Sequence, residues 1–236
     1  MLLVCIPTLV LSGEEQDTLK NKLRANVMFS LNSNGIASVP AFSLGKPALV
    51  SSATLSKGRF SYDPALAYSL EMKPWYIDNW FRYKIILRPK FEMKAGVDFS
   101  TFFSEFVTND EKIMKAERYF AFSIAGTYKF SPVSALTLDY WSDNGQEKGT
   151  MTGHFIYLAY DRSEINIAEK AFLSVNLMLF YVNYTGKNDG LFVSPKSSLS
   201  VKSIPVSIFI QATQAIKSNI SPWPGFKCNV GISYNL

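Results

Sequence analysis

The sequence predicts an all-β protein, a single antiparallel up-and-down transmembrane β-barrel of about 12 strands. Three observations support this prediction. Apolar and polar residues alternate along most of the chain, long and short connections take turns between the alternating segments, and the last strand ends in a distinctive spacing of residues. Strand side chains point alternately to two faces, so each such segment forms one apolar and one polar face.

The composition limits where the apolar residues can lie. Of the 236 residues, 47% are hydrophobic, 14% are aromatic and only 18% are charged. No apolar run after the N-terminus approaches the roughly 18 residues that a membrane-spanning helix needs. The net charge of +5 comes from basic residues spread singly and in short pairs. This pattern has no basic stripe or recognition motif, so we expect no nucleic-acid partner.

The N-terminal stretch 1–13, MLLVCIPTLVLSG, is apolar and ends in small residues. This is typical of the hydrophobic part of a secretory signal peptide, although the usual basic start is missing, which we expect to reflect either a truncated N-terminus or a misassigned start codon. The alternative is a first core strand. If the stretch is a signal, residues 14–21 form a periplasmic N-terminal segment and residues 22–236 form the barrel. Removal of Cys5 then leaves Cys228 alone, without an intrachain disulfide partner.

Strands are expected at 22–32, 47–56, 59–71, 79–88, 90–103, 115–130, 133–143, 151–161, 168–184, 190–201, 204–216 and 225–236. The alternation is clearest, in chain order, in LRANVMFSL, FRYKIILR, FEMKAGVDF, RYFAFSIAGTYKF, FLSVNLMLFYVNY, PVSIFIQATQAI and GFKCNVGISYNL. It is weakest in VSSATLSK and GHFIYLAYDR, where both faces are mixed. A period of two repeated this often indicates β-structure.

The connections follow a rule. Those after odd-numbered strands are long, at 33–46, 72–78, 104–114, 144–150, 185–189 and 217–224. Those after even-numbered strands are short, except 162–167. Short turns on one rim and loops on the other are typical of outer-membrane barrels, whereas soluble sandwiches have no such rule. We therefore expect one domain in a bacterial outer membrane, with both termini in the periplasm.

The alternative to a membrane barrel is a soluble barrel whose apolar faces point inward. Aromatic residues near the strand ends favour the membrane, because amphipathic rings gather at its two interfaces. The predicted interface aromatics are Trp75, Trp80, Tyr140 and Trp223. The polar face would then line the lumen. The predicted lumen-lining charges are Arg82, Lys84, Arg88, Lys90, Glu92, Lys94, Asp98, Lys129 and Asp139.

The C-terminal strand resembles the assembly signal of bacterial outer-membrane proteins. Asn229, Gly231, Tyr234 and Leu236 fit its spacing, although the last residue is Leu instead of the usual Phe or Trp. The whole region 22–236 resembles a family of small outer-membrane β-barrel proteins of Bacteroidota-type bacteria, through KGRFSYDPAL, KPWYIDNWFRYKI, NDGLFVS and SNISPWPGFKCNVGISYNL. The resemblance implies the fold and the location, and little about activity.

His154 is the single histidine and raises the hypothesis of an enzyme. Outer-membrane lipid hydrolases place a serine two residues after the histidine, because the imidazole must take the hydroxyl proton. Here that position holds Ile156, so we expect an interfacial histidine without a catalytic role. One histidine and no paired thiols also argue against a metal site, and no cofactor is expected.

The predicted function is a narrow channel or a structural barrel with a charged polar lumen. Its charges either pair into a network that fills the lumen or form an electropositive wall that favours anions. The alternatives are an accessory subunit of a larger outer-membrane complex and a lipid-modifying enzyme. The expected partners are outer-membrane lipids and lipopolysaccharide, the barrel-assembly machinery during biogenesis, and in the subunit alternative another outer-membrane protein.

Overall fold

The computed structural model describes residues 22–37, 43–108, 110–185, 188–220 and 225–236. The predicted signal peptide 1–13, the segment 14–21 and Trp223 lie outside these residues. The twelve strands are β1 (Arg24–Asn32), β2 (Ala48–Lys57), β3 (Phe60–Ser69), β4 (Pro74–Leu87), β5 (Phe91–Thr108), β6 (Glu111–Ser131), β7 (Ser134–Gly145), β8 (Thr152–Ala168), β9 (Ala171–Tyr184), β10 (Asn188–Val201), β11 (Val206–Ser218) and β12 (Lys227–Asn235).

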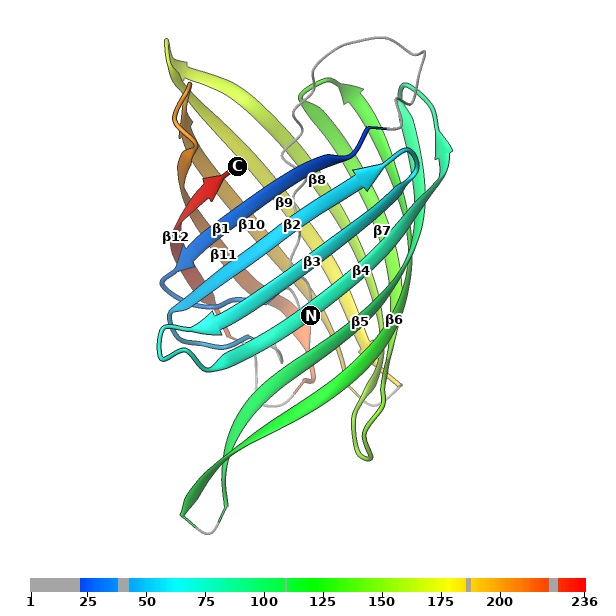
Figure 1. Ribbon diagram of the computed structural model, residues 1–236, viewed down its shortest axis with the longest axis vertical. Coiled ribbons are helices and arrows are strands. Elements are labelled where there is room, and N and C mark those ends of the chain that lie inside the picture. Colours follow the sequence, from blue (N-terminus) through cyan, green and yellow to red (C-terminus); the bar gives the residue numbers. More distant parts are fainter. Residues whose placement is uncertain (1–21, 38–42, 109, 186–187, 221–224) are drawn as a thin grey trace.

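The strands form one closed antiparallel barrel in which each strand pairs with its neighbours in sequence and β1 pairs with β12 (Figure 1). The predicted fold class is confirmed. Backbone hydrogen bonds between Val27 and Leu236, at 2.8 and 3.2 Å, join the outer ends of the first and last strands. Closure satisfies the edge strands that an open sheet would leave unpaired.

Three predicted connections are wrong in their extent. β8 continues to Ala168, so residues 162–167 are strand and the β8–β9 connection is as short as the other even-numbered ones. β4 begins at Pro74, inside the predicted loop 72–78. β5 and β6 continue to Thr108 and Glu111, and their hairpin stands out beyond the barrel at the bottom of Figure 1. Pairing with a long neighbour extends these strands into segments whose own alternation is weak.

The barrel has two different rims. One rim, here called the tight-turn rim, carries the connections 58–59, 88–90, 132–133, 169–170 and 202–205, together with the outer ends of β1 and β12. The other, the loop rim, carries the remaining connections. Gly58 lies in the β2–β3 turn with φ of 61°, a conformation that glycine adopts without steric cost.

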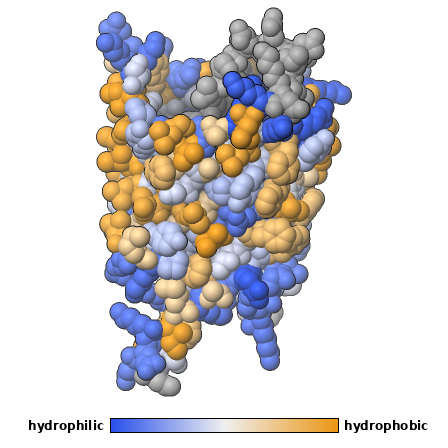
Figure 2. Space-filling model, viewed as in Figure 1, coloured by the Kyte–Doolittle hydropathy of each residue, from blue (hydrophilic) through white to orange (hydrophobic). Residues whose placement is uncertain are grey.

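The outer surface is apolar between the rims. Figure 2 shows a hydrophobic band across the middle of the barrel and hydrophilic residues at both ends. Outward side chains of β12, such as Val230, Ile232 and Tyr234, are 40–50% exposed, while Asn229 and Ser233 on the opposite face of the strand are buried in the interior. The apolar face of β12 therefore points out and its polar face points in. Among the described residues there is no helix long and apolar enough to cross a membrane.

Asn229 and Gly231 close the seam between β12 and β1. The Asn229 side chain donates a hydrogen bond to Asn32 Oδ1 at 2.9 Å and accepts one from the backbone N–H of Asn34 at 3.1 Å. Gly231 lies under the ring of Phe209: a Cβ at this position would be 2.3 Å from that ring. Asn229 and Gly231, two residues of the predicted assembly signal, therefore stabilise the closed barrel. Recognition of the signal by the assembly machinery stays a prediction.

Candidate functional site: the barrel lumen

The lumen has two unlike walls. On β10, β11, β12, β1 and β2 most inward side chains are short and carry hydroxyl or amide groups. They include Ser30, Asn32, Ser52, Ser194, Thr213, Asn229 and Ser233. The hydroxyls of Ser194 and Thr213 are 3.0 Å apart, and those of Ser207 and Ser233 are 2.7 Å apart. We call this the hydroxyl wall. The opposite wall, on β3–β8, carries long charged and aromatic side chains.

Arg82 is the central cation of the opposite wall. Its Nη1 lies 2.5 Å from Oδ2 of Asp63 on β3, and its guanidinium lies 4.4 Å from the centre of the Trp80 ring. Gly96 on β5 makes room for the arginine, because a Cβ there would be 2.9 Å from Arg82 Cγ. The ion pair with Asp63 and the ring of Trp80 thus hold the guanidinium of Arg82 against the lumen wall.

A second cluster lies nearer the tight-turn rim. Lys84 on β4 and Lys94 on β5 are register partners, and both reach Glu92, at 3.1 and 3.6 Å. Lys129 faces inward near the same rim. Thus the inward cations Arg82, Lys84 and Lys94 all have acidic partners, which weakens the hypothesis of an electropositive wall.

Two of the predicted lumen charges lie elsewhere. Arg88 and Lys90 are exposed in the β4–β5 turn, not on the lumen wall. The turn closes with a hydrogen bond between the backbone N–H of Arg88 and the carbonyl of Phe91, at 2.9 Å. Strand pairing ends before these residues, so the inward direction extrapolated from the alternation does not apply to them.

The inward acids form the other part of the wall. Asp139 accepts a hydrogen bond from the hydroxyl of Tyr157 at 3.1 Å, and Asp161 accepts one from Asn176 at 2.8 Å. Asp98 is fully buried, and so is Asp78, which the sequence-based reasoning missed. Asp78 and Arg82 are four residues apart in β4 and so lie on the same face. If the predicted strand had begun before residue 79, the alternation would have placed Asp78 in the lumen.

The loop-rim half of the lumen is packed with aromatic rings, and two predicted interface aromatics belong here. Trp80 and Trp75 are only 5% and 4% exposed and face inward, so their placement at the membrane interface is wrong. Trp80 shares the inward parity of Arg82. At Trp75 a β-bulge in the β3–β4 pairing leaves an extra residue, and both Trp75 and Tyr76 are buried. Tyr140 faces outward, as expected.

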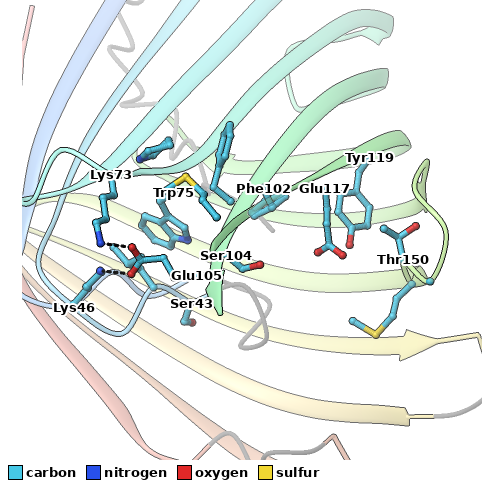
Figure 3. Close-up of a pocket in the computed structure, with 16 residues that line it drawn as sticks. Ser43, Lys46, Lys73, Trp75, Phe102, Ser104, Glu105, Glu117, Tyr119 and Thr150 are labelled. Atoms are coloured by element: carbon cyan, nitrogen blue, oxygen red, sulfur yellow. Dashed lines mark hydrogen bonds and ion pairs between the residues drawn. The ribbon is translucent and has the colours of Figure 1, made fainter. Parts of the chain in front are cut away.

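A pocket of about 550 Å³ opens at the loop rim (Figure 3). Its wall combines aromatic rings, hydroxyls and charges, among them Trp75, Phe102, Tyr119, Ser43, Ser104, Thr150, Lys46, Lys73, Glu105 and Glu117. Gly35 and Leu44, from the connection between β1 and β2, pack at Trp75. The described parts of that connection therefore fold into the mouth of the barrel.

No family model and no curated protein sequence matches this chain. Among solved structures it is similar to the KdgM porin in complex with disordered oligogalacturonate, with a TM-score of 0.59 and 8% identity over 89% of this chain and 98% of that chain. It is also similar to the NanC porin, with a TM-score of 0.50 and 9% identity over 90% and 100% of the two chains. The chain has the fold of an outer-membrane porin. At this identity the likeness concerns the fold alone.

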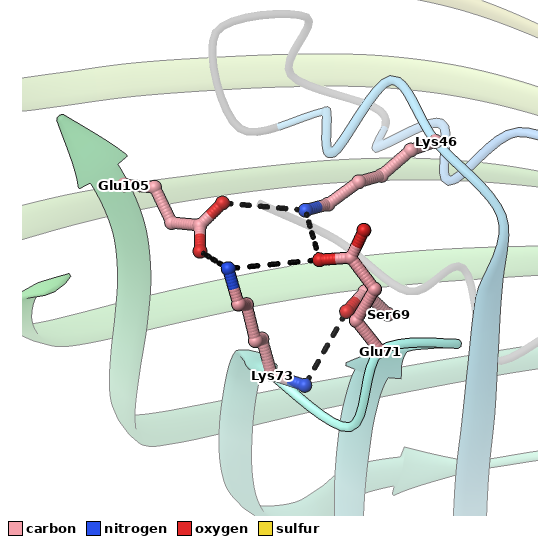
Figure 4. A network of polar contacts seen from close by, with 5 residues as sticks. All are labelled: Lys46, Ser69, Glu71, Lys73 and Glu105. Carbon is pink, nitrogen blue, oxygen red and sulfur yellow. Dashed lines mark hydrogen bonds and ion pairs between the residues drawn. The ribbon is translucent and has the colours of Figure 1, made fainter. Parts of the chain in front are cut away.

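Four charged residues form a mouth network beside the pocket of this porin-like barrel (Figure 4). Lys46 lies 3.3 Å from Glu105 and 3.6 Å from Glu71, and Lys73 lies 3.6 Å from Glu71 and hydrogen-bonds to Glu105. Lys46 precedes β2, Glu71 and Lys73 lie between β3 and β4, and Glu105 is on β5. The network thus ties the inward-folded connection to the base of the protruding hairpin.

We expect the Glu105→Gln variant to loosen that connection. The hydrogen bond from Lys73 lowers the pKa of Glu105, and that same bond raises the pKa of Lys73. The network is therefore fully formed at pH values above the ordinary pKa of a glutamate. It is lost as the pH falls below about 4 and Glu105 becomes protonated. At neutral pH the amides of Gly35 and Leu44, bonded to Lys46 and Gly35 carbonyls at 2.9 Å, should exchange about two- to fivefold faster in the variant.

The control is Glu111→Gln, because Glu111 is exposed and has no ion pair among the described residues. Hydrogen exchange measured by mass spectrometry compares the two variants with the natural chain from pH 3 to pH 8. Unchanged protection in Glu105→Gln, or equal loss in Glu111→Gln, would show that the network does not hold the connection.

His154 lies on the outward face of β8, together with Ile156. Its cross-strand neighbour is Ser142, yet its Nδ1 lies 2.9 Å from the hydroxyl of Tyr140 instead. A nucleophile and its base would need a hydrogen bond between them. Within the described residues, no group of three or more His, Cys, Asp or Glu side chains is placed to hold a metal.

Proposed function

We propose that this protein is a narrow channel of a bacterial outer membrane, with its tight-turn rim and both termini in the periplasm. The observation that carries the proposal is the pairing of an apolar exterior with a lumen lined by a hydroxyl wall and an ion-paired wall. Lipid requires the first surface, and a hydrated solute path requires the second. The barrel of the KdgM porin, solved with oligogalacturonate, supports a channel role for this fold.

The same proposal includes its partners. The apolar band would contact membrane lipids, the charged loop rim would face lipopolysaccharide, and the β12 spacing would be recognised by the assembly machinery. Membership of the Bacteroidota-type barrel family rests on the sequence resemblance. The contact of His154 with Tyr140 instead of Ser142 argues against a lipid-modifying enzyme.

Planar-bilayer recording of the refolded protein tests the channel. We expect stepwise currents from samples that show heat-modifiable gel mobility, the sign of a closed barrel. The aromatic packing of the loop-rim half predicts small single-channel currents. Folded protein that never conducts would contradict a channel and favour the accessory-subunit alternative, in which another outer-membrane protein co-purifies after mild detergent extraction.

A further inference from the structure

Three inward side chains on β4 and β5 form a group of buried oxygen atoms. Asp78, Asp98 and Ser100 are 2%, 0% and 3% exposed. The register that pairs Trp80 with Asp98 continues without a shift to Ile77 and Thr101, so Asp78 faces Ser100 and lies diagonally next to Asp98 on one face. The three side chains therefore share one small region of the wall.

A hydrogen bond turns Asp98 towards β4. Its Oδ1 accepts from the backbone N–H of Asn79 at 2.8 Å. The Asn79 side chain in turn donates to the carbonyl of Phe99 at 3.0 Å. Asn79 follows Asp78 directly, so this contact brings the Asp98 carboxylate to the part of β4 that carries Asp78.

One oxygen of each of these three residues has no hydrogen-bond partner: Asp78 Oδ1, Asp98 Oδ2 and Ser100 Oγ. Buried oxygens of this kind are costly unless an ion or another polar group meets them. The nearest cation along β4 is Arg82, which is already bonded to Asp63 at 2.5 Å. The local charge is thus acidic and is not balanced by the ion pairs of the wall.

We propose that Asp78, Asp98 and Ser100 bind a hard cation in the lumen, and that the channel consequently prefers cations to anions. Carboxylate and hydroxyl oxygens are the ligands of Ca²⁺-type ions, and one divalent ion balances two carboxylates while water completes its shell. The preference for cations rests on the proposed channel function, whereas the binding site does not. It replaces the anion preference that the count of lysines and arginines suggested, because three of those cations, Arg82, Lys84 and Lys94, are paired with carboxylates and two others, Arg88 and Lys90, lie in the β4–β5 turn.

Terbium luminescence tests the site without any current. Tb³⁺ replaces Ca²⁺ at oxygen sites and emits when a nearby tryptophan is excited, and Trp80 is the cross-strand neighbour of Asp98. Folded barrel in detergent should give a saturable signal that Ca²⁺ displaces. The double variant Asp78→Asn, Asp98→Asn should lower the Tb³⁺ affinity at least about tenfold.

The matched control is Asp161→Asn, a lumen carboxylate whose hydrogen bond from Asn176 satisfies it. Its affinity for Tb³⁺ should equal that of the natural chain, with heat-modifiable mobility confirming that all three barrels are closed. Full affinity in the double variant, or an equal loss in the control, would overturn the site.

Reversal potentials in a KCl gradient test the selectivity. The natural channel should favour K⁺, the double Asn variant should shift towards Cl⁻, and Asp161→Asn should shift less. An anion-selective natural channel, or no shift in the double variant, would overturn the preference while leaving the channel itself established. Absence of current would refute the channel, and the terbium titration would still decide the cation site.

Discussion

Replacing Gly231 with alanine should prevent stable closure of the barrel. A Cβ at this position would lie 2.3 Å from the ring of Phe209 and 2.5 Å from the backbone carbonyl oxygen of Leu31 on β1. Lys196 Nζ also lies 4.2 Å from the centre of this ring, so a movement of the ring would disturb that contact. Overpacking typically costs about 1–3 kcal/mol, and a clash with a backbone atom lies at the upper end of that range, so we expect the free energy of unfolding to fall by about 3 kcal/mol.

The measurement is urea unfolding after refolding into detergent, which removes any effect of the assembly machinery. Gly126→Ala is the matched control: Gly126 faces outward, and a Cβ there would be 3.5 Å from Phe91, an ordinary contact. Adding Phe209→Ala to Gly231→Ala should restore only part of the stability, because the Leu31 carbonyl remains. Normal stability of Gly231→Ala would show that the β12–β1 seam is looser than its contacts indicate.

Breaking the pair of Arg82 and Asp63 should also destabilise the barrel strongly. The two side chains are only 18% and 10% exposed, and their atoms are 2.5 Å apart. Asp63→Asn leaves the guanidinium buried against Trp80 and Gly96 without a counter-charge. Removal of one partner of a buried pair costs roughly 3 kcal/mol, and replacing both partners with apolar or neutral groups costs much less.

A double-mutant cycle measures this difference. Unfolding of Asp63→Asn, Arg82→Met and the double variant should give a favourable coupling energy of about 2 kcal/mol. The pair of Lys115 and Glu117 on the protruding hairpin, at the same 2.5 Å but with the lysine 46% exposed, is the control and should give less than about 1 kcal/mol. Equal couplings in both cycles would mean that lumen water screens the buried pair.

The loss of Asp63 also bears on the proposed cation site. Arg82 freed from Asp63 would be the nearest basic group to Asp78 along β4, so Asp63→Asn should weaken Tb³⁺ binding even though Asp63 is not among the proposed ligands. The ion pair of Arg82 and Asp63 and the proposed cation site are therefore coupled: while Arg82 is paired with Asp63, its charge does not offset that of Asp78 and Asp98.

The number, order and facing of the strands follow from the sequence by itself. Alternation is a local property: once Phe81, Tyr83 and Ile85 face lipid, Arg82 and Lys84 must face inward, whatever the rest of the chain does. The alternation of short and long connections likewise sets the topology, because strands joined by tight turns are antiparallel neighbours. The same alternation places Trp80 on the inward face with Arg82. The prediction that Trp80 lies at the membrane interface was wrong because it followed the general preference of aromatic residues for interfaces instead of this alternation.

Other features were decided only by the tertiary structure. The β-bulge that buries Trp75 is a property of two paired strands, and the extension of β8 to Ala168 comes from its pairing with β9. The choice of Asp63 and Glu92 as partners for the lumen cations depends on which strands adjoin and in what register. Whether a lumen charge is paired is a question of distance between strands, so a count of basic residues could not reveal that Asp78 and Asp98 each keep a buried oxygen without a hydrogen-bond partner.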